Sequence, residues 1–367
     1  MPAPPTVDFE RLLAPISPEN PSGVELREDD EGSRLFAELY DTFKKARADE
    51  RKKRDQVFIE ASGSSSADPS ARQEIDEPDW HAIREQAVEL LATHSKDLWV
   101  TAWLTDALVR TDGIPGLRDG LKLVHELSTT YWDAIHPTPE DGSYEGTTAQ
   151  LTSLFGDPLA SAIRNVPLAV GAEFTFGQYR HAATSDNAAL GPILSAVQET
   201  PASFYVDLVD AIRSSLANLS AAAQFFMDRC GPEATPNPSA VRTELEECLN
   251  NVRTVAADKL ESAAAEEGDE SEGGGEGAGK TGGKGVGFDV SGQIASREDA
   301  FRTLVKIAEY FKKAEPTSPV PILLDYAVRL GKKPFTDLIL ELVSDESVRD
   351  EVYRRIGARL QSGEAEE

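Results

Sequence analysis

The sequence predicts a mainly α-helical, multi-domain protein, and three observations support this fold class. Apolar residues recur at helical spacing over long stretches, for example at Trp80, Ile83, Ala87 and Leu90. Short connections that contain Gly or Pro separate these stretches, which is typical of helices packed antiparallel. The alternating pattern of a half-buried strand is confined to residues 173–179, where it predicts at most one hairpin.

The N-terminal part is expected to form a helical domain of residues 1–140. The first predicted helix of this part begins at Trp80. After it, Ser95 can cap a second helix, and Gly113 lies just beyond the end of that helix. A third helix begins near Pro115 and carries apolar residues to about Tyr131. The short connections between these helices predict an antiparallel cluster.

A middle helical domain of residues 141–260 precedes the strongest break in composition, at residues 261–292. Ten of the twenty residues from Gly268 to Gly287 are glycine, and an acidic run leads into them. Such a stretch buries too little apolar surface to offset the entropy lost on ordering. It therefore predicts a flexible, acidic, Gly-rich linker between a large N-terminal part and a small C-terminal domain.

The C-terminal domain, residues 293–362, is expected to contain four helices. The first begins at the capping residue Ser296, the second ends at Gly331, and the others begin near Pro334 and Ser344. The first helix carries apolar residues around most of its circumference, and so small a domain needs further surfaces to bury them. We therefore expect this domain to oligomerise. The residues proposed for the contact are Phe301, Leu304, Ile307, Tyr310, Phe311 and Leu323.

The chain is strongly acidic, since 37 Lys and Arg oppose 64 Asp and Glu and give a formal net charge of −27. A field of this sign repels DNA, RNA and anionic lipid, so these are unfavourable partners. The acidity is uneven: residues 1–257 hold 22 basic and 41 acidic side chains, whereas residues 291–362 hold 12 and 11. Electrostatic self-repulsion therefore does not oppose association of the C-terminal domain.

Two features bear on the cellular compartment. The two cysteines, Cys230 and Cys248, exclude a disulfide framework or a multi-cysteine metal site and fit a reducing environment. The N-terminus lacks the basic and apolar regions of a signal peptide, and no stretch approaches 18 consecutive apolar residues. We expect a cytoplasmic protein without a membrane span.

One motif of nucleotide-binding enzymes is formally complete at Gly274–Thr281, which matches the P-loop pattern G-x-x-x-x-G-K-[ST]. A P-loop lies between a buried strand and a helix whose N-terminus faces phosphate. Here an acidic run precedes the motif and more glycines follow it, so we interpret it as part of the linker. A nucleotide-binding enzyme that uses Lys280 and Thr281 is the alternative.

The histidines do not complete a catalytic or metal site. His125 and Glu126 begin like the zinc motif H-E-x-x-H, but Thr129 stands where the second histidine ligand must be. The sequence contains neither a G-x-S-x-G nucleophile elbow nor a C-x-x-C pair. We therefore predict no catalytic residues, no metal site and no cofactor.

The main basic run of the chain is Lys44–Arg54, with seven positive residues around Asp49 and Glu50. One interpretation is a solvated helix whose charges form ion pairs at i, i+3 and i, i+4 spacing. The other is an electrostatic docking surface for an acidic partner.

Several separated blocks in the N-terminal part point to a known family. They are Leu12–Ser17, Asn20–Arg27, Leu91–Leu98, Trp103–Leu104, and Tyr131–Asp133 followed by His136–Pro137. In this order they resemble the ImpA N-terminal domain of TssA proteins from type VI secretion systems. The resemblance covers most of residues 9–137.

A second block lies in the C-terminal domain, at Ser296–Phe301, Ala308–Phe311, Glu315–Val320 and Ala327–Arg329. It resembles the ring-forming C-terminal domain of short TssA proteins. The sequence departs from that pattern at Thr317, Leu330 and Lys333–Phe335.

The resemblance implies a non-enzymatic scaffold of the type VI secretion system. Such a scaffold organises the baseplate and guides assembly of the sheath and the Hcp tube through a homo-oligomeric ring, and it also contacts membrane-complex proteins. It implies a cytoplasmic protein associated with the secretion apparatus at the inner membrane. A generic helical adaptor unrelated to secretion is a further alternative.

Overall fold

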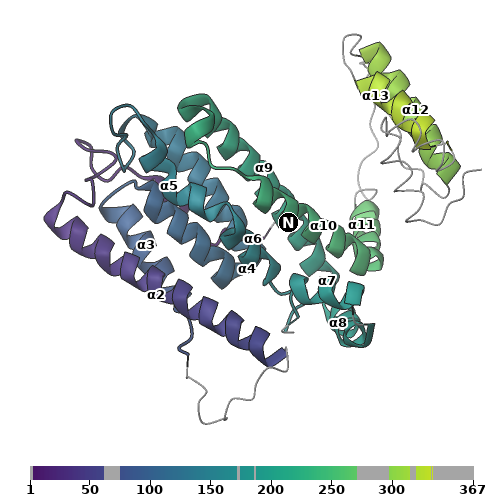
Figure 1. The fold of residues 1–367 in the computed structure, drawn as a ribbon, viewed down its shortest axis with the longest axis horizontal. Helices are drawn as coiled ribbons and strands as arrows, with labels where there is room; N and C mark the ends of the chain where they lie inside the picture. Colours follow the sequence, from purple (N-terminus) through teal and green to yellow (C-terminus); the bar gives the residue numbers. More distant parts are fainter. Residues whose placement is uncertain are drawn as a thin grey trace, which may run out of the picture. The chain divides into compact units, whose positions relative to one another are not determined.

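The computed structural model describes residues 3–61, 75–171, 174–185, 187–270, 297–314, 320–331 and 333. In this part of the chain the regular structure is helical, and the β-type pairings are isolated bridges (Figure 1). The predicted mainly α-helical class is confirmed. The chain forms two compact units, residues 1–275 and residues 276–367.

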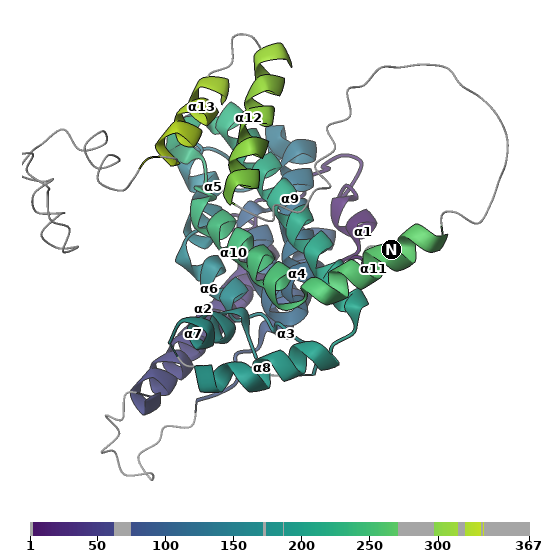
Figure 2. The same cartoon turned by 90° about the vertical axis from the view of Figure 1, so that its right-hand side faces the viewer.

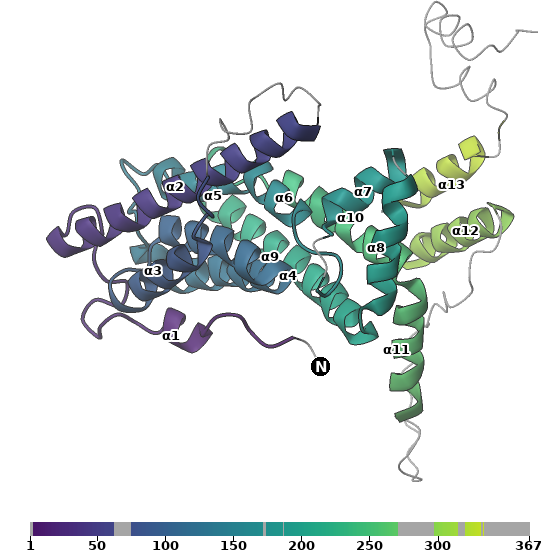
Figure 3. The same cartoon turned by 90° about the horizontal axis from the view of Figure 1, so that it is seen from below.

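The first unit is built around two long helices, α4 and α9, which pack along each other. Helix α3 covers α4 on another side, and α10 packs against α9 and α6 (Figure 2). Helices α7 and α8 lie side by side at the end of the unit away from the start of α2 (Figures 1 and 3). The elements of this unit are α1 (Phe9–Leu13), α2 (Asp30–Ala61), α3 (Trp80–Thr93), α4 (Leu98–Tyr131), the 3-10 helix η2 (Trp132–Ala134), α5 (Glu145–Leu154), α6 (Asp157–Arg164), α7 (Phe176–Ser185), α8 (Asn187–Glu199), α9 (Ala202–Ala234), α10 (Ser239–Val255) and α11 (Ala257–Glu270).

Helix α4 consists of two helical segments joined at a sharp kink. Gly113 at the kink has φ of 65° and ψ of −142°, and Pro115 follows it, so the backbone hydrogen bonds of a straight helix are interrupted there. A Cβ atom on Gly116 would lie 2.1 Å from the carbonyl oxygen of Leu108, because the two segments approach closely. The two helices predicted to meet between Gly113 and Pro115 are therefore confirmed.

The N-terminal cap of α4 differs from the prediction. Asp97, not Ser95, supplies it: its Oδ1 accepts hydrogen bonds from Trp99 N (2.8 Å) and Val100 N (3.1 Å). Ser95 instead forms an isolated antiparallel bridge with Gly23. The loop that contains Gly23 recruits the backbone of Ser95, and the cap moves two residues along the chain.

The alternating pattern at residues 173–179, which allowed at most one hairpin, forms no hairpin in the described residues 174–179, because helix α7 begins at Phe176. Thr175 N donates to Gln178 Oε1 (2.9 Å), and Gln178 N donates to Thr175 Oγ1 (3.3 Å). This reciprocal pair is a capping box, which satisfies backbone donors at the start of a helix. Extended pairing here is limited to one bridge, between Pro167 and Thr175.

Helix α2 packs over α4 through aromatic rings. The ring centres of Phe36 and Phe43 lie 5.2 Å and 5.4 Å from that of Trp103 on α4. Trp103 is almost completely buried, and Trp99, four residues earlier, is partly buried on the same helical face. These large side chains fill the space between the two helices, and Figure 3 shows α2 crossing the outside of α3 and α4.

The packing within the first unit crosses the expected domain boundary at residue 140. The expected domains of residues 1–140 and 141–260 both lie in this unit, because α4 packs along α9 and Thr148 Oγ1 donates to Ala234 O (2.7 Å). Helix α11 runs to Glu270, so the first ten residues of the expected linker are helical. Ala and Glu are frequent between 261 and 267, and both favour a helix. Residues 271–292 lie outside the described part.

In the second unit the described helices are α12 (Arg297–Ala314) and α13 (Val320–Gly331), as predicted. They pack together around the buried side chains of Ala308 and Val328. Lys312 Nζ donates to Asp325 Oδ2 (2.6 Å) and links the two helices at the surface. The helices predicted to begin near Pro334 and Ser344 lie outside the described residues.

Candidate docking site

Three segments far apart in the sequence meet beside the start of α4. Lys96 N donates to Ser22 O (2.8 Å), and His136 N donates to Lys96 O (3.0 Å). Gly23 has φ of 75°, and a Cβ atom there would lie 1.9 Å from His94 O, so a larger residue does not fit. We call this region the signature joint, defined as residues 20–27, 94–98 and 131–137.

Arg27 is the central cation of the signature joint. Its Nη1 donates to Asp97 Oδ2 (2.8 Å) and to Glu25. Its guanidinium carbon lies 4.4 Å from the ring centres of both Phe36 and Trp99, which hold the charge between two aromatic faces. Because Asp97 also caps α4, this arginine ties the loop before α2 to the start of the central helix.

His136 and Glu25 form an ion pair in the joint, with 3.2 Å between His136 Nδ1 and Glu25 Oε2. Burial opposes the charged form of the carboxylate, but hydrogen bonds from His136 and Arg27 outweigh it and lower the pKa of Glu25 to about 2. Burial also opposes charged His136, yet the hydrogen bond to Glu25 raises its pKa above the ordinary 6.5. The charged groups of the signature joint thus pair with one another. This pairing indicates that the joint holds its three chain segments together.

The structure divides the basic run on α2 into two sets. Four of its seven cations form ion pairs within the fold: Lys45 with Asp76, Lys52 with Asp49, Lys53 with Glu77, and Arg47 with Asp106. Lys44, Arg51 and Arg54 have no carboxylate partner in the part of the chain that the structure describes. All three are exposed. The ion-pair interpretation therefore holds for four cations, and three remain available.

A buried ionic network fixes this part of α2 to α4. Asp106 is fully buried and lies between Arg47 Nη2 (2.8 Å) and Arg110 Nη1 (2.6 Å). Arg110 also donates through Nε and Nη2 to both carboxylate oxygens of Glu50 (2.7 and 3.0 Å), and its guanidinium carbon lies 4.1 Å from the ring centre of Trp80. Burial raises the pKa of Asp106, although the two arginines favour its charged form. The network thus holds Glu50, the residue before Arg51, against α4.

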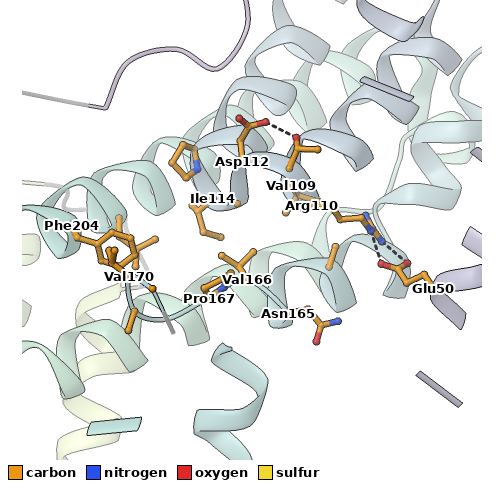
Figure 4. A pocket seen from close by; sticks show the side chains of 17 residues that line it. Glu50, Val109, Arg110, Asp112, Ile114, Asn165, Val166, Pro167, Val170 and Phe204 are labelled. Atoms are coloured by element: carbon orange, nitrogen blue, oxygen red, sulfur yellow. Dashed lines mark hydrogen bonds and ion pairs between the residues drawn. The ribbon is translucent and has the colours of Figure 1, made fainter. Parts of the chain in front are cut away.

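An apolar hollow of about 500 Å³ opens at the kink of α4 (Figure 4). Its apolar walls come from α4, from the loop after α6 and from the start of α9. Val170 on that loop is 57 % exposed, a large fraction for an apolar side chain. The lining residues that matter below are Val109, Ile114, Val166, Pro167, Val170 and Phe204.

A smaller basic hollow of about 170 Å³ adjoins the apolar one. Arg51 and Arg54 of α2 line it on one side, and the α6 residues Asp157, Pro158 and Ser161 line it on the other. Glu50 lines both hollows, while the neighbouring α6 residues Ser161 and Ala162 each line one of them. We name the two hollows together the α2–α6 groove.

The residues proposed for oligomerisation lie on α12 and α13. Leu323 is 62 % exposed, and two neighbours that the sequence did not single out, Ile322 and Tyr326, are 72 % and 39 % exposed. Phe301, Leu304 and Ile307 are partly buried on α12. The side chains of Tyr310 and Phe311, like Lys280 and Thr281, lie outside the described part.

Two further observations concern alternative functions. Among the described residues, no three His, Cys, Asp or Glu side chains are grouped so that they could hold a metal ion. No helix in that same part of the chain combines the length and the apolar character needed to cross a membrane.

Comparisons with known proteins agree on one family. Residues 13–156 match the family model "ImpA, N-terminal, type VI secretion system". A solved N-terminal domain of the TssA component from Burkholderia cenocepacia, which includes the conserved ImpA_N region, matches with a TM-score of 0.52 and 26 % identity. The match covers 70 % of this chain and 99 % of that one. The type VI secretion system component TssA1 of Pseudomonas aeruginosa is 29 % identical over 365 residues, 95 % of this chain and 98 % of that protein.

The chain is similar to TssA proteins over nearly its whole length. This similarity favours a TssA-like component of a type VI secretion system over a helical adaptor unrelated to secretion. The signature joint lies within the ImpA_N match. The α2–α6 groove combines α2 and α4 of the matched region with α6 and the following loop, which lie beyond residue 156. The sequence did not predict the groove because its walls come from four separate segments.

Proposed function

We propose that this protein is a non-enzymatic scaffold of the type VI secretion system that acts as a homo-oligomeric ring. In this proposal it organises the baseplate and guides assembly of the sheath and the Hcp tube. It works in the cytoplasm, at the apparatus on the inner membrane. The observation that carries the proposal is the similarity to TssA1 over 95 % of the chain.

The exposed apolar residues of α13 support the ring. Ile322, Leu323 and Tyr326 lie within two turns of one helix, and the first two remain largely exposed after packing on α12. Burial of one such side chain in a contact stabilises it by about 1.5 to 3 kcal/mol. Residues 291–362 hold 12 basic and 11 acidic side chains, so several copies can associate without strong repulsion.

The unit of residues 1–275 then supplies one arm for each subunit of the ring. Several identical arms raise the effective concentration of their binding sites at a symmetric target, as expected for an assembly guide. The acidic surface of these arms disfavours nucleic acid, which leaves protein partners: baseplate, sheath, Hcp tube and membrane-complex subunits.

Light scattering on the full chain tests the ring. We expect a mass of several subunits for the natural protein and a shift towards the monomer for Leu323→Asp. Lys306→Asp places a carboxylate at an exposed polar position of α12 and serves as the matched control. A monomeric natural protein contradicts the proposal, as does a Leu323→Asp variant that assembles as fully as the control.

A further inference from the structure

We propose that the α2–α6 groove binds an acidic, amphipathic segment of a partner protein. In this complex, apolar side chains of the segment enter the apolar hollow, and its carboxylates pair with Arg51 and Arg54. The inference deepens the proposed function and rests on it, because it describes the chemistry of one partner of the arm.

The basic half of the groove is suited to carboxylates. Arg51 and Arg54 line the hollow, are exposed and have no carboxylate partner among the described residues. Lys44 lies seven residues before Arg51, about two helical turns, so it stands on the same face of α2. Guanidinium groups bind carboxylates through paired hydrogen bonds, and such bonds are stronger than those between neutral groups.

The two acidic residues at the edge of the apolar hollow are already paired. Asp112 accepts two hydrogen bonds from Arg84 Nη1 (2.8 and 3.1 Å), and Glu50 accepts two from Arg110. Their charges are therefore neutralised locally and repel an acidic ligand little. In the small hollow Asp157 adds one exposed carboxylate, which lies 3.5 Å from Arg164 Nη2, so the two cations Arg51 and Arg54 still outnumber it.

The apolar half supplies the anchor for the segment. Its volume of about 500 Å³ lies in the range of about 300 to 1,000 Å³ that is typical of ligand sites. Figure 4 shows Val166, Val170 and Phe204 at this hollow, and Val170 is the most exposed of them. Partner segments that bind grooves commonly use a few apolar anchors flanked by charges.

A protein segment fits the groove better than a nucleic acid does. Residues 1–257 hold 22 basic and 41 acidic side chains, and a field of this sign repels a long polyanion more strongly than a short segment with a few carboxylates. A phosphate backbone also carries no apolar side chain that could fill the apolar hollow. A short segment that alternates apolar and acidic residues matches both halves.

The test uses the full chain and an array of labelled peptides of about 15 residues with a constant Leu-Leu pair and zero to six Glu residues. Fluorescence anisotropy measures binding. We expect affinity to rise with the number of Glu residues and to fall between about 50 and 300 mM salt. Arg51→Glu with Arg54→Glu should weaken binding by at least about tenfold, and Val170→Asp should weaken it by about as much.

The matched control is Arg213→Glu with Arg253→Glu, which reverses the same number of charges on exposed faces of α9 and α10. These substitutions should leave binding within about twofold, since they act only through the distant field. Circular dichroism confirms that each variant remains helical.

Three outcomes overturn the inference. In the first, no peptide of the array binds. In the second, the control substitutions weaken binding as much as those in the groove. In the third, a single-stranded oligonucleotide binds more tightly than every peptide and is lost with the same variants, which indicates a polyanion site. The light-scattering result separates the two proposals, because a chain that assembles without binding peptide refutes only the groove, and a monomer that binds peptide refutes only the ring.

Discussion

The Nζ atom of Lys96 donates a hydrogen bond of 2.8 Å to the carbonyl oxygen of Leu12, 84 residues earlier in the chain. A second hydrogen bond, of 2.7 Å, reaches Leu91 O in the last turn of α3. Lys96 is completely buried, and burial lowers its pKa to about 8. The ammonium group therefore closes the C-terminal ends of α1 and α3 at the same time, where helix carbonyls lack backbone donors.

Replacement of this lysine should destabilise the first unit markedly. Lys96→Met keeps the apolar part of the side chain but leaves two buried carbonyl oxygens without their donor. We expect a loss of about 2 to 4 kcal/mol in the free energy of unfolding, measured by urea denaturation. Lys44→Met, at an exposed position without an ion pair to any described residue, is the control and should change the free energy of unfolding little. An equal effect of the two substitutions would contradict the capping role.

The same lysine predicts a pH dependence above neutrality. Its pKa is about 8 in the folded chain and near 10.5 in the unfolded one, so between these values the unfolded state binds more protons. The free energy of unfolding of the natural protein, relative to Lys96→Met, should therefore rise between about pH 8 and pH 10. A flat or falling difference over this range would show that Lys96 is not desolvated.

His136 and Glu25 predict a second pH dependence, with the opposite sign for the histidine. The raised pKa of His136 means that its contribution to stability is complete below about 6.5 and is lost as the pH rises through the folded value. The lowered pKa of Glu25 means that its contribution is present above about 4.5 and is lost as the pH falls towards 2. Hence His136→Gln should lower the free energy of unfolding more at about pH 5.5 than at about pH 8. Urea denaturation at these two pH values is the measurement, and a larger cost at the higher value would refute the pairing.

Gly23 should tolerate no side chain. Its φ of 75° disfavours other residues, and a Cβ atom would collide with His94 O at 1.9 Å. Gly23→Ala is expected to lower the free energy of unfolding by at least about 2 kcal/mol, because the atoms of His94 that the new Cβ would meet belong to the backbone. Gly146, on α5, has open space around its Cβ position. Gly146→Ala should instead leave stability unchanged or raise it by about 0.5 to 1 kcal/mol, and thermal unfolding of the two variants distinguishes them.

Asp106→Asn should be severely destabilising although it changes few atoms. The substitution removes the negative charge between Arg47 and Arg110 and leaves two buried guanidinium groups facing each other. Breaking a buried pair in this way costs about 3 to 5 kcal/mol. The exposed pair of Lys122 and Glu126 offers a control, since Glu126→Gln should cost less than about 1 kcal/mol. Comparable unfolding midpoints in urea for these two variants would contradict the ionic network.

Local sequence signals were sufficient to predict helices whose limits depend on their own residues. The helix from Trp80, the two segments that meet between Gly113 and Pro115, and the first two C-terminal helices were predicted from periodicity, caps and breakers. Prediction failed where two local signals competed. At Thr175 the alternating pattern of a strand lost to a capping box with Gln178, and at Ser95 a favourable cap residue was drawn into a bridge with Gly23.

The sequence by itself determined the helical class, the acidic N-terminal part and the near-neutral C-terminal one, and its separated blocks pointed to the TssA family. These properties are carried by composition, periodicity and short motifs. Only the tertiary structure decided which cations of the Lys44–Arg54 run form ion pairs and which have no carboxylate partner among the described residues. It also decided that Lys96 meets Leu12 and that α2 faces α6. Such pairings depend on long-range packing, in which residues tens of positions apart become neighbours, and no local pattern encodes that distance.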